Sequence, residues 1–198
     1  FWVYSDGWTN NETFYEAYAA STDRWELRIK TGGDLALESI VGGSTVVDVN
    51  FDNANMPTGA WFHLEISRSG STFRCFINGT ETGDAQTSSG SMGTAARQLK
   101  IGRSGDMNTV WKGYMDEHRI SKGIVRHTSN FTPSTTAHKD DVNTTLLLHM
   151  DGGGGIDGET LLPTLPGQGT YFLDSSTNAI FYDADGIENR RDPFYWQM

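Results

Sequence analysis

The sequence predicts an all-β fold of two packed antiparallel sheets, and three observations lead to this prediction. Short runs of alternating apolar and polar residues follow one another, no segment sustains the 3.6-residue period of an amphipathic helix, and 23 glycines supply turns. Aromatic residues make up 12% of the 198 residues, enough to fill a core although the hydrophobic fraction is only 36%. These features favour a β-sandwich over a helical bundle or a disordered chain.

The expected strands come at the spacing that is typical of a sandwich. The first five are residues 1–5, 13–20, 24–30, 35–41 and 44–51. Glycine pairs in "TGGD" and "VGGS" predict the turns after the third and the fourth of them. The later strands are a hairpin in "WFHLEISRSGSTFRCFINGTETG" (61–83), then 97–104 and 111–121.

The hairpin has one core face and one outer face, because side chains alternate along a strand. Phe62 and Leu64 fall on the core face, whereas His63, Glu65 and Arg74 share the outer face. The hairpin is therefore mainly scaffold, with an outer surface that is open to a ligand.

Composition excludes several function classes. The formal net charge of −10 comes without a basic stripe, which argues against nucleic acid as the partner. No run reaches the roughly 18 apolar residues that membrane insertion requires. The single cysteine, Cys75, excludes an intrachain disulfide, and its place in an alternating strand predicts a buried thiol.

Five motifs carry a resemblance to a known family. They are "WFHLEISRSG" with "FING", "LKIGR", "WKGYMDEHRISKG" and "HTSNFTP", in this order after "FWVY". In this order the sequence resembles the laminin-G-like, concanavalin-A-like jelly-roll family, and it is most similar to domains of bacteriophage tail-fibre and other virion proteins. The resemblance covers about two thirds of the chain and implies a two-sheet antiparallel jelly-roll sandwich.

The pattern changes near residue 139, so we expect a jelly-roll domain at 1–138 and a C-terminal extension at 139–198. The family has an opening strand before "FWVY" that is missing from this chain. We expect residues 143–151, "NTTLLLHMD", to complete a sheet in the same molecule or in a neighbour. The predicted assembly surface combines this strand with the aromatic tail "DPFYWQM" and consists of Leu147, Phe194, Tyr195 and Trp196.

An enzyme is disfavoured. Glycosidases of this fold need two carboxylates on one strand face, but Asp116 and Glu117 are adjacent and point to opposite faces. The five histidines are scattered, and no Gly-x-Ser-x-Gly nucleophile elbow occurs.

Sugar binding needs an aromatic platform with polar groups at its edge. Trp8 and Trp111 sit among polar loop residues and are the preferred platform, with core packing an equally open alternative. Tyr114 and Arg74 complete the predicted ligand-binding set. The remaining strand tryptophans are assigned to packing: Trp2, Trp25 and Trp61.

Calcium is a further expectation, since acidic loops can supply the six to eight oxygens that it prefers. The resemblance implies that Asp116 is a ligand or fixes a strand end, and Asp106 and Asp84 lie in loops that could meet it. The segment "DGGGGIDGE" (151–159) is another candidate.

The sequence thus predicts a non-enzymatic virion or tail-fibre adhesion module that binds host-surface glycans. A purely structural virion subunit that mediates self-assembly is the alternative, and a glycan-cleaving enzyme is the third. A virion or extracellular location and a homo-oligomer are expected.

Overall fold

The computed structural model describes residues 1–9, 11–30, 32–52, 56–93, 97–105 and 109–150, together with the backbone of 181–182 and 188–189. The chain forms two compact units, Phe1–Leu147 and Leu148–Met198. In the described part of the chain no helix is long and apolar enough to span a membrane. Both large sheets belong to the first unit, and each unit is considered by itself.

The first unit is all-β, as the sequence predicts. Its early strands are β1 (Trp2–Ser5), β2 (Thr13–Ala20), β3 (Asp23–Ile29), β4 (Leu35–Val41), β5 (Ser44–Phe51), β6 (Trp61–Ser69) and β7 (Thr72–Ile77). Its later strands are β8 (Thr80–Glu81), β9 (Gln86–Thr87), β10 (Gln98–Ile101), β11 (Gly113–Asp116), β12 (His118–Ser121) and β13 (Thr144–Leu148). In the second unit β14 (Phe181–Tyr182) pairs with β15 (Glu188–Asn189).

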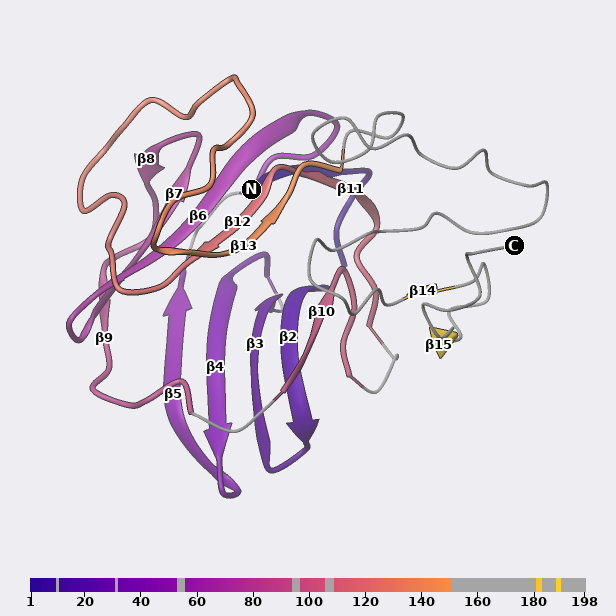
Figure 1. Cartoon of the computed structure of the whole chain (residues 1–198), viewed down its shortest axis with the longest axis vertical. Helices are drawn as coiled ribbons and strands as arrows, with labels where there is room; N and C mark the ends of the chain where they lie inside the picture. The colour runs from indigo at the N-terminus through magenta and orange to yellow at the C-terminus, as the bar shows by residue number, and fades with distance from the viewer. Residues whose placement is uncertain are drawn as a thin grey trace. The chain divides into compact units, whose positions relative to one another are not determined.

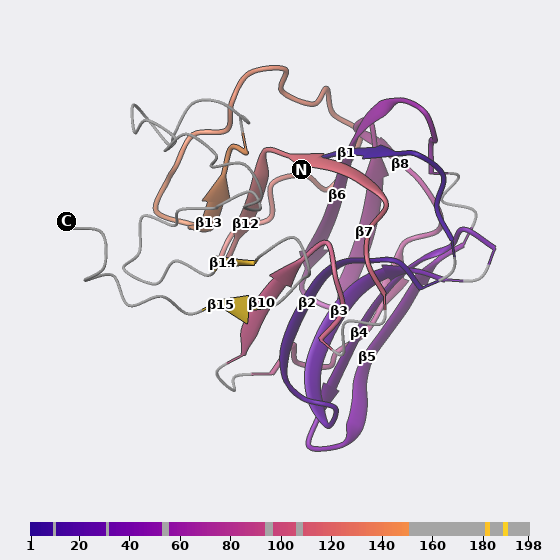
Figure 2. The same cartoon turned by 90° about the vertical axis from the view of Figure 1, so that its right-hand side faces the viewer.

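Two antiparallel sheets form the sandwich. The five-stranded sheet has the order β10-β2-β3-β4-β5, and Figure 1 shows these strands side by side. The six-stranded sheet has the order β11-β1-β6-β7-β8, with β9 also paired to β7. Figure 2 shows β6 and β7 as a layer separate from β2–β5, and β5 contacts β7 and β9 where the layers meet.

Apolar residues at alternate strand positions fill the space between the sheets. The five-stranded sheet contributes Tyr15, Leu27, Ile29, Leu35, Leu37, Val47, Val49 and Phe51. The six-stranded sheet contributes Val3, Phe62, Leu64, Phe73 and Cys75. The core faces predicted for the hairpin are therefore confirmed, and the Cys75 thiol is buried, which raises its pKa to about 12.

Between β12 and β13 the chain crosses the outer face of the hairpin without regular structure. We call residues 122–143 the strap, and Figure 1 shows it in orange, arching over the ends of β6, β7 and β8. The Phe131 amide donates to the Gly79 carbonyl at 2.9 Å, and the His127 ring stacks on the Phe131 ring. Arg126, near the start of the strap, binds both carboxylate oxygens of Asp141, near its end, at 2.6 and 2.9 Å.

The strap leads to β13, which pairs with β12 in a two-stranded sheet. The first unit consequently extends past residue 138, where the sequence analysis placed a boundary. Leu147 lies in β13 and is half-buried, while Phe194, Tyr195 and Trp196 lie outside the described residues. The division into domain and extension, and the assembly role of these four residues, stay predictions.

Candidate functional site

Three aromatic side chains form an exposed group on the outer face of the six-stranded sheet. Tyr4 in the middle strand β1 is the register partner of Tyr114 in β11 and of Trp61 in β6. Val3 and Ser5 on either side of Tyr4 are fully buried, so the alternation of β1 directs Tyr4 outward. We call Tyr4, Trp61 and Tyr114 the aromatic platform.

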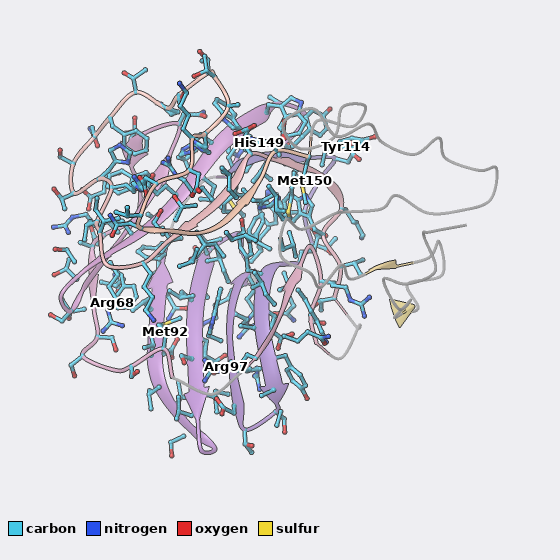
Figure 3. The ribbon with its side chains drawn as sticks, viewed as in Figure 1. Arg68, Met92, Arg97, Tyr114, His149 and Met150 are labelled. Atoms are coloured by element: carbon cyan, nitrogen blue, oxygen red, sulfur yellow. The ribbon has the colours of Figure 1, made fainter. Side chains whose placement is uncertain are left out.

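The three rings lie close together without stacking. The ring centroids are 5.9 Å apart for Tyr4 and Trp61, 5.8 Å for Tyr4 and Tyr114, and 6.5 Å for Trp61 and Tyr114. Tyr4 is tilted by 59° to both of the others. Trp61 is 47% exposed and Tyr114 is 63% exposed, so their rings are available to a ligand. Figure 3 shows Tyr114 beside β11, at the outside of the sheet.

A glycine in β11 allows this strand to approach β1 closely. Gly113 has φ 143° and lies so close to β1 that a Cβ there would come within 1.9 Å of the Tyr4 carbonyl oxygen. Only glycine avoids this collision and adopts this φ without strain. The residue before Tyr114 thus fixes how closely β11 approaches β1, and with it the ring spacing.

Charged groups border the platform. Asp6 and Lys112 are both exposed, each is two residues from a platform tyrosine, and the Asp6 amide donates to the Lys112 carbonyl at 3.4 Å. Asp116 lies on the other side, two residues beyond Tyr114, and is the register partner of Trp2. Polar edge groups of this kind can bind the hydroxyls of a sugar whose C–H face rests on the rings.

The strap ends the open aromatic surface on one side. His63 lies in the next row of the same outer face and is only 4% exposed, because the rings of Phe131 and His138 lie 5.7 and 6.4 Å from its own. Burial lowers the pKa of His63 to about 3, so this side chain is neutral at physiological pH. Glu65, the next outer-face residue of β6, accepts from His127 of the strap at 3.0 Å. The strap thus covers the outer face of β6 at His63 and Glu65, while Trp61 at the start of the same strand stays open.

The structure places the two preferred tryptophans elsewhere. Trp8 and Trp111 are half-buried and pack against the hydrophobic core. The Trp111 ring lies 4.5 Å from the ring of Phe14, and the Trp8 ring occupies the space where a side chain at Gly33 would lie. Neither joins Tyr114 in one surface, so their positions favour the packing alternative.

Arg74 and Asp116, predicted to bind ligand and metal respectively, both contact neighbouring residues. Arg74 lies 3.3 Å from the Glu81 carboxylate on the neighbouring strand. Asp116 Oδ1 accepts from the Glu117 amide at 2.8 Å, where φ of Glu117 is 50° and the chain turns from β11 into β12. Glu117 in turn accepts from the His138 amide at 2.7 Å and so anchors the strap. These contacts give Asp116 the strand-end role that the sequence analysis offered as one option.

Asp84, another predicted metal ligand, lines the second of two adjoining polar hollows. One hollow of about 390 Å³ is lined by Asn11, Lys30, Asp34, Asn50, Asp52 and Gln86. An adjoining hollow of about 370 Å³ shares Asp52 and Gln86 and adds Gly83 and Asp84.

Among the described residues no three His, Cys, Asp or Glu side chains gather where they could hold a metal ion. Asp106 and the segment 151–159 lie outside the described residues. Calcium therefore stays a prediction and takes no part in the mechanism proposed below.

The outer face of the five-stranded sheet carries a row of acids. Glu16, Glu26, Glu38 and Asp48 are register partners on β2, β3, β4 and β5. Arg24 lies 3.7 Å from Glu16 and 3.5 Å from Glu26, and Arg28 pairs with Glu26 and Glu38. We call these four acids with the two arginines the charged row. Each of its three glutamates lies in an ion pair, and the two arginines offset half of the charge of the four acids.

The platform could have been found in the sequence in part. The sequence analysis assigned Trp61 to packing, whereas the structure leaves it 47% exposed. Because Trp61 precedes the core residue Phe62, alternation already directs it to the outer face with His63 and Glu65. Tyr4 follows from the same reasoning next to Val3. Neither strand reveals that β1 lies between β6 and β11, because this order joins segments 57 and 110 residues away from Tyr4 in sequence.

Sequence comparison agrees with this architecture. The profile of the laminin-G type described as the concanavalin A-like lectin/glucanases superfamily matches residues 1–128. The chain belongs to this superfamily. A search of curated proteins finds no match. The superfamily holds both lectins and glucanases, so the function must be argued from the site itself.

Proposed function

We propose that this superfamily member is a non-enzymatic adhesion module that binds glycans through the aromatic platform. The observation that carries the proposal is the group of three unstacked rings on adjacent strands, two of them about half exposed or more. A pyranose presents a flat C–H face that packs on such rings, while Asp6, Lys112 and Asp116 are placed to meet its hydroxyls.

Binding needs no movement of the sheet. The platform residues project from three hydrogen-bonded strands, and sites on strands are held more rigidly than sites on loops. The loss of side-chain freedom on binding is small for tyrosine and tryptophan, because each has only two side-chain torsions. Both features favour binding, and repeated copies in an assembly would raise the overall affinity further.

The place of action is proposed on the resemblance of the quoted motifs to virion and tail-fibre domains. In that setting the module lies outside the cell and meets host-surface glycans. Several copies in one particle would supply the multivalency that a weak site requires.

The test is a glycan-array screen of the full chain, followed by calorimetric titration of the glycans that bind. Trp61→Ala and Tyr114→Ala should each weaken binding at least about tenfold, since loss of a central aromatic contact costs about 1.4 kcal/mol or more. The matched control is Tyr18→Ala, a half-buried tyrosine of the five-stranded sheet. Equal affinity in all three variants would refute the platform.

A structural subunit is the second candidate, and one observation favours it. Exposed tyrosine and tryptophan side chains are also enriched where protein subunits meet. If the platform joins copies of this chain, Trp61→Ala should convert an oligomer to a monomer in analytical ultracentrifugation and leave the glycan array blank. An unchanged oligomeric state together with lost glycan binding favours the adhesion module.

A further inference from the structure

We infer that the platform selects glycans that carry positively charged amino groups, such as polymers of glucosamine with a free amine. This inference rests on the proposed function, because it names the sugar class that the same three rings accept. Two observations carry it: the geometry of the ring triangle and the carboxylates beside it.

The ring triangle fits a single ammonium group. With centroid separations of 5.9, 5.8 and 6.5 Å, the point equidistant from the centroids lies about 3.5 Å from each. An ammonium about 4 Å above that point is about 5 Å from all three centroids, within the roughly 6 Å over which a cation above a ring face is attracted. Because the Tyr4 ring is tilted by 59° to both of the others, one charge lies near all three rings but faces them unequally.

The carboxylates favour the same charge. Asp6 and Asp116 lie on the two sides of the platform, each two residues from a platform tyrosine. Lys112 is the opposing cation, and its Nζ lies 4.0 Å from Glu12, so part of its charge is directed away. The whole chain carries a formal charge of −10, which attracts cationic polymers and repels acidic glycans.

A sugar with an amine combines both attractions. The C–H face of the sugar packs on one aromatic ring of the platform. The ammonium on a neighbouring carbon of the sugar then lies near the other two aromatic rings. The N-acetylated form of the same sugar keeps the C–H face but loses the charge. An N-acetylated and a free-amine oligomer of equal length therefore form a matched pair of ligands that isolates the charge.

The experiment titrates the full chain with glucosamine hexamer, N-acetylglucosamine hexamer and cellohexaose, using calorimetry at low salt and at about 0.5 M salt. We expect the glucosamine hexamer to bind at least about tenfold more tightly than either neutral hexamer, and the ratio to shrink at high salt as charges are screened. Asp6→Asn and Asp116→Asn should each reduce the ratio, because asparagine keeps an acceptor oxygen and removes the charge. Hexalysine is the control for charge without a sugar.

Each other outcome has a separate meaning. Equal binding of the three hexamers, abolished by Trp61→Ala, overturns the charge selectivity and leaves the proposed function standing. Preference for glucosamine hexamer that survives Trp61→Ala with Tyr114→Ala, or equal binding of hexalysine, overturns the inference because the attraction is then general. If no glycan binds, both the inference and the proposed function are wrong.

Discussion

The outward-facing strand positions carry different kinds of side chain on the two sheets. On the five-stranded sheet the outward residues include Glu16, Glu26 and Glu38, and Arg24 and Arg28 satisfy them within the face. On the six-stranded sheet the outward residues of β1, β6 and β11 include Tyr4, Trp61 and Tyr114, and the rings of Trp61 and Tyr114 remain about half exposed or more.

This difference suits the five-stranded face to stabilising the fold and the six-stranded face to binding a ligand. A face whose polar groups already bond to one another gains little from a ligand, whereas exposed rings gain when a flat apolar surface displaces water. The strap contacts His63 and Glu65 next to the platform. Trp61 and Tyr114 of the platform stay exposed.

Acid should produce the largest effect, and it acts through two buried histidines, His63 in β6 of the six-stranded sheet and His118 in β12. Burial lowers the pKa of both His63 and His118 to about 3, while their pKa in the unfolded chain is about 6.5. The unfolded chain therefore binds more protons between these values, so stability is full above about pH 6.5 and falls as the pH decreases. At about pH 4.5 the loss is about 3 kcal/mol for each histidine.

The measurement is the free energy of unfolding in denaturant at about pH 7 and about pH 4.5. His63→Gln and His118→Gln should each remove about half of the pH dependence. A double variant that keeps the full dependence contradicts the assignment to these two side chains.

Gly113→Ala should have the next largest effect, because its Cβ would collide with the Tyr4 carbonyl and its φ of 143° disfavours other residues. We expect a loss of about 3 kcal/mol in the free energy of unfolding, together with lost glycan binding as β11 moves away from β1. The control is Gly70→Ala, where φ is 60° but no atom lies within 4 Å of the added Cβ. This control should cost only about 1 kcal/mol and keep binding; equal losses at both glycines would contradict the role of Gly113.

Arg28→Met tests the charged row. It leaves Glu26 and Glu38 with fewer partners on a face where their side chains are 12% and 20% exposed. We expect a loss of about 2 kcal/mol in the free energy of unfolding, without a change in glycan affinity. Arg74→Met is the matched control on the other sheet, where a single pair with Glu81 predicts less than about 1 kcal/mol. A fall in glycan affinity with Arg28→Met would instead move the binding site to the charged row.

Trp61→Ala should have the smallest effect on stability. Nearly half of this side chain is exposed, so its removal should change the free energy of unfolding by about 0.5 kcal/mol, although it removes glycan binding. Thermal melts of the variant and the parent chain provide the measurement. A loss above about 2 kcal/mol would show that the ring is structural and would remove the contrast between the two faces.

Local pattern sufficed for most of the fold. Alternation in "WFHLEIS" and "TFRCFI" placed Phe62, Leu64 and Cys75 in the core, and the double-glycine turns separated the strands of the five-stranded sheet. Local pattern does not decide where a loop residue points. Trp8 and Trp111 sit among polar neighbours, yet the Trp8 ring fills the space beside Gly33 and the Trp111 ring packs on Phe14.

The sequence by itself determined that this chain forms two sheets with a Phe- and Leu-rich core, because a period of two sorts side chains locally. The same period is consistent with the outward positions of Tyr4 and Trp61, although the sequence analysis assigned Trp61 to packing. Only the tertiary structure decided that their strands lie beside β11, that the strap covers His63, and that the acids of four strands stand in one row. Strand order and loop coverage depend on pairings between distant segments, and these are set by the packing of the whole sandwich rather than by any single stretch of sequence.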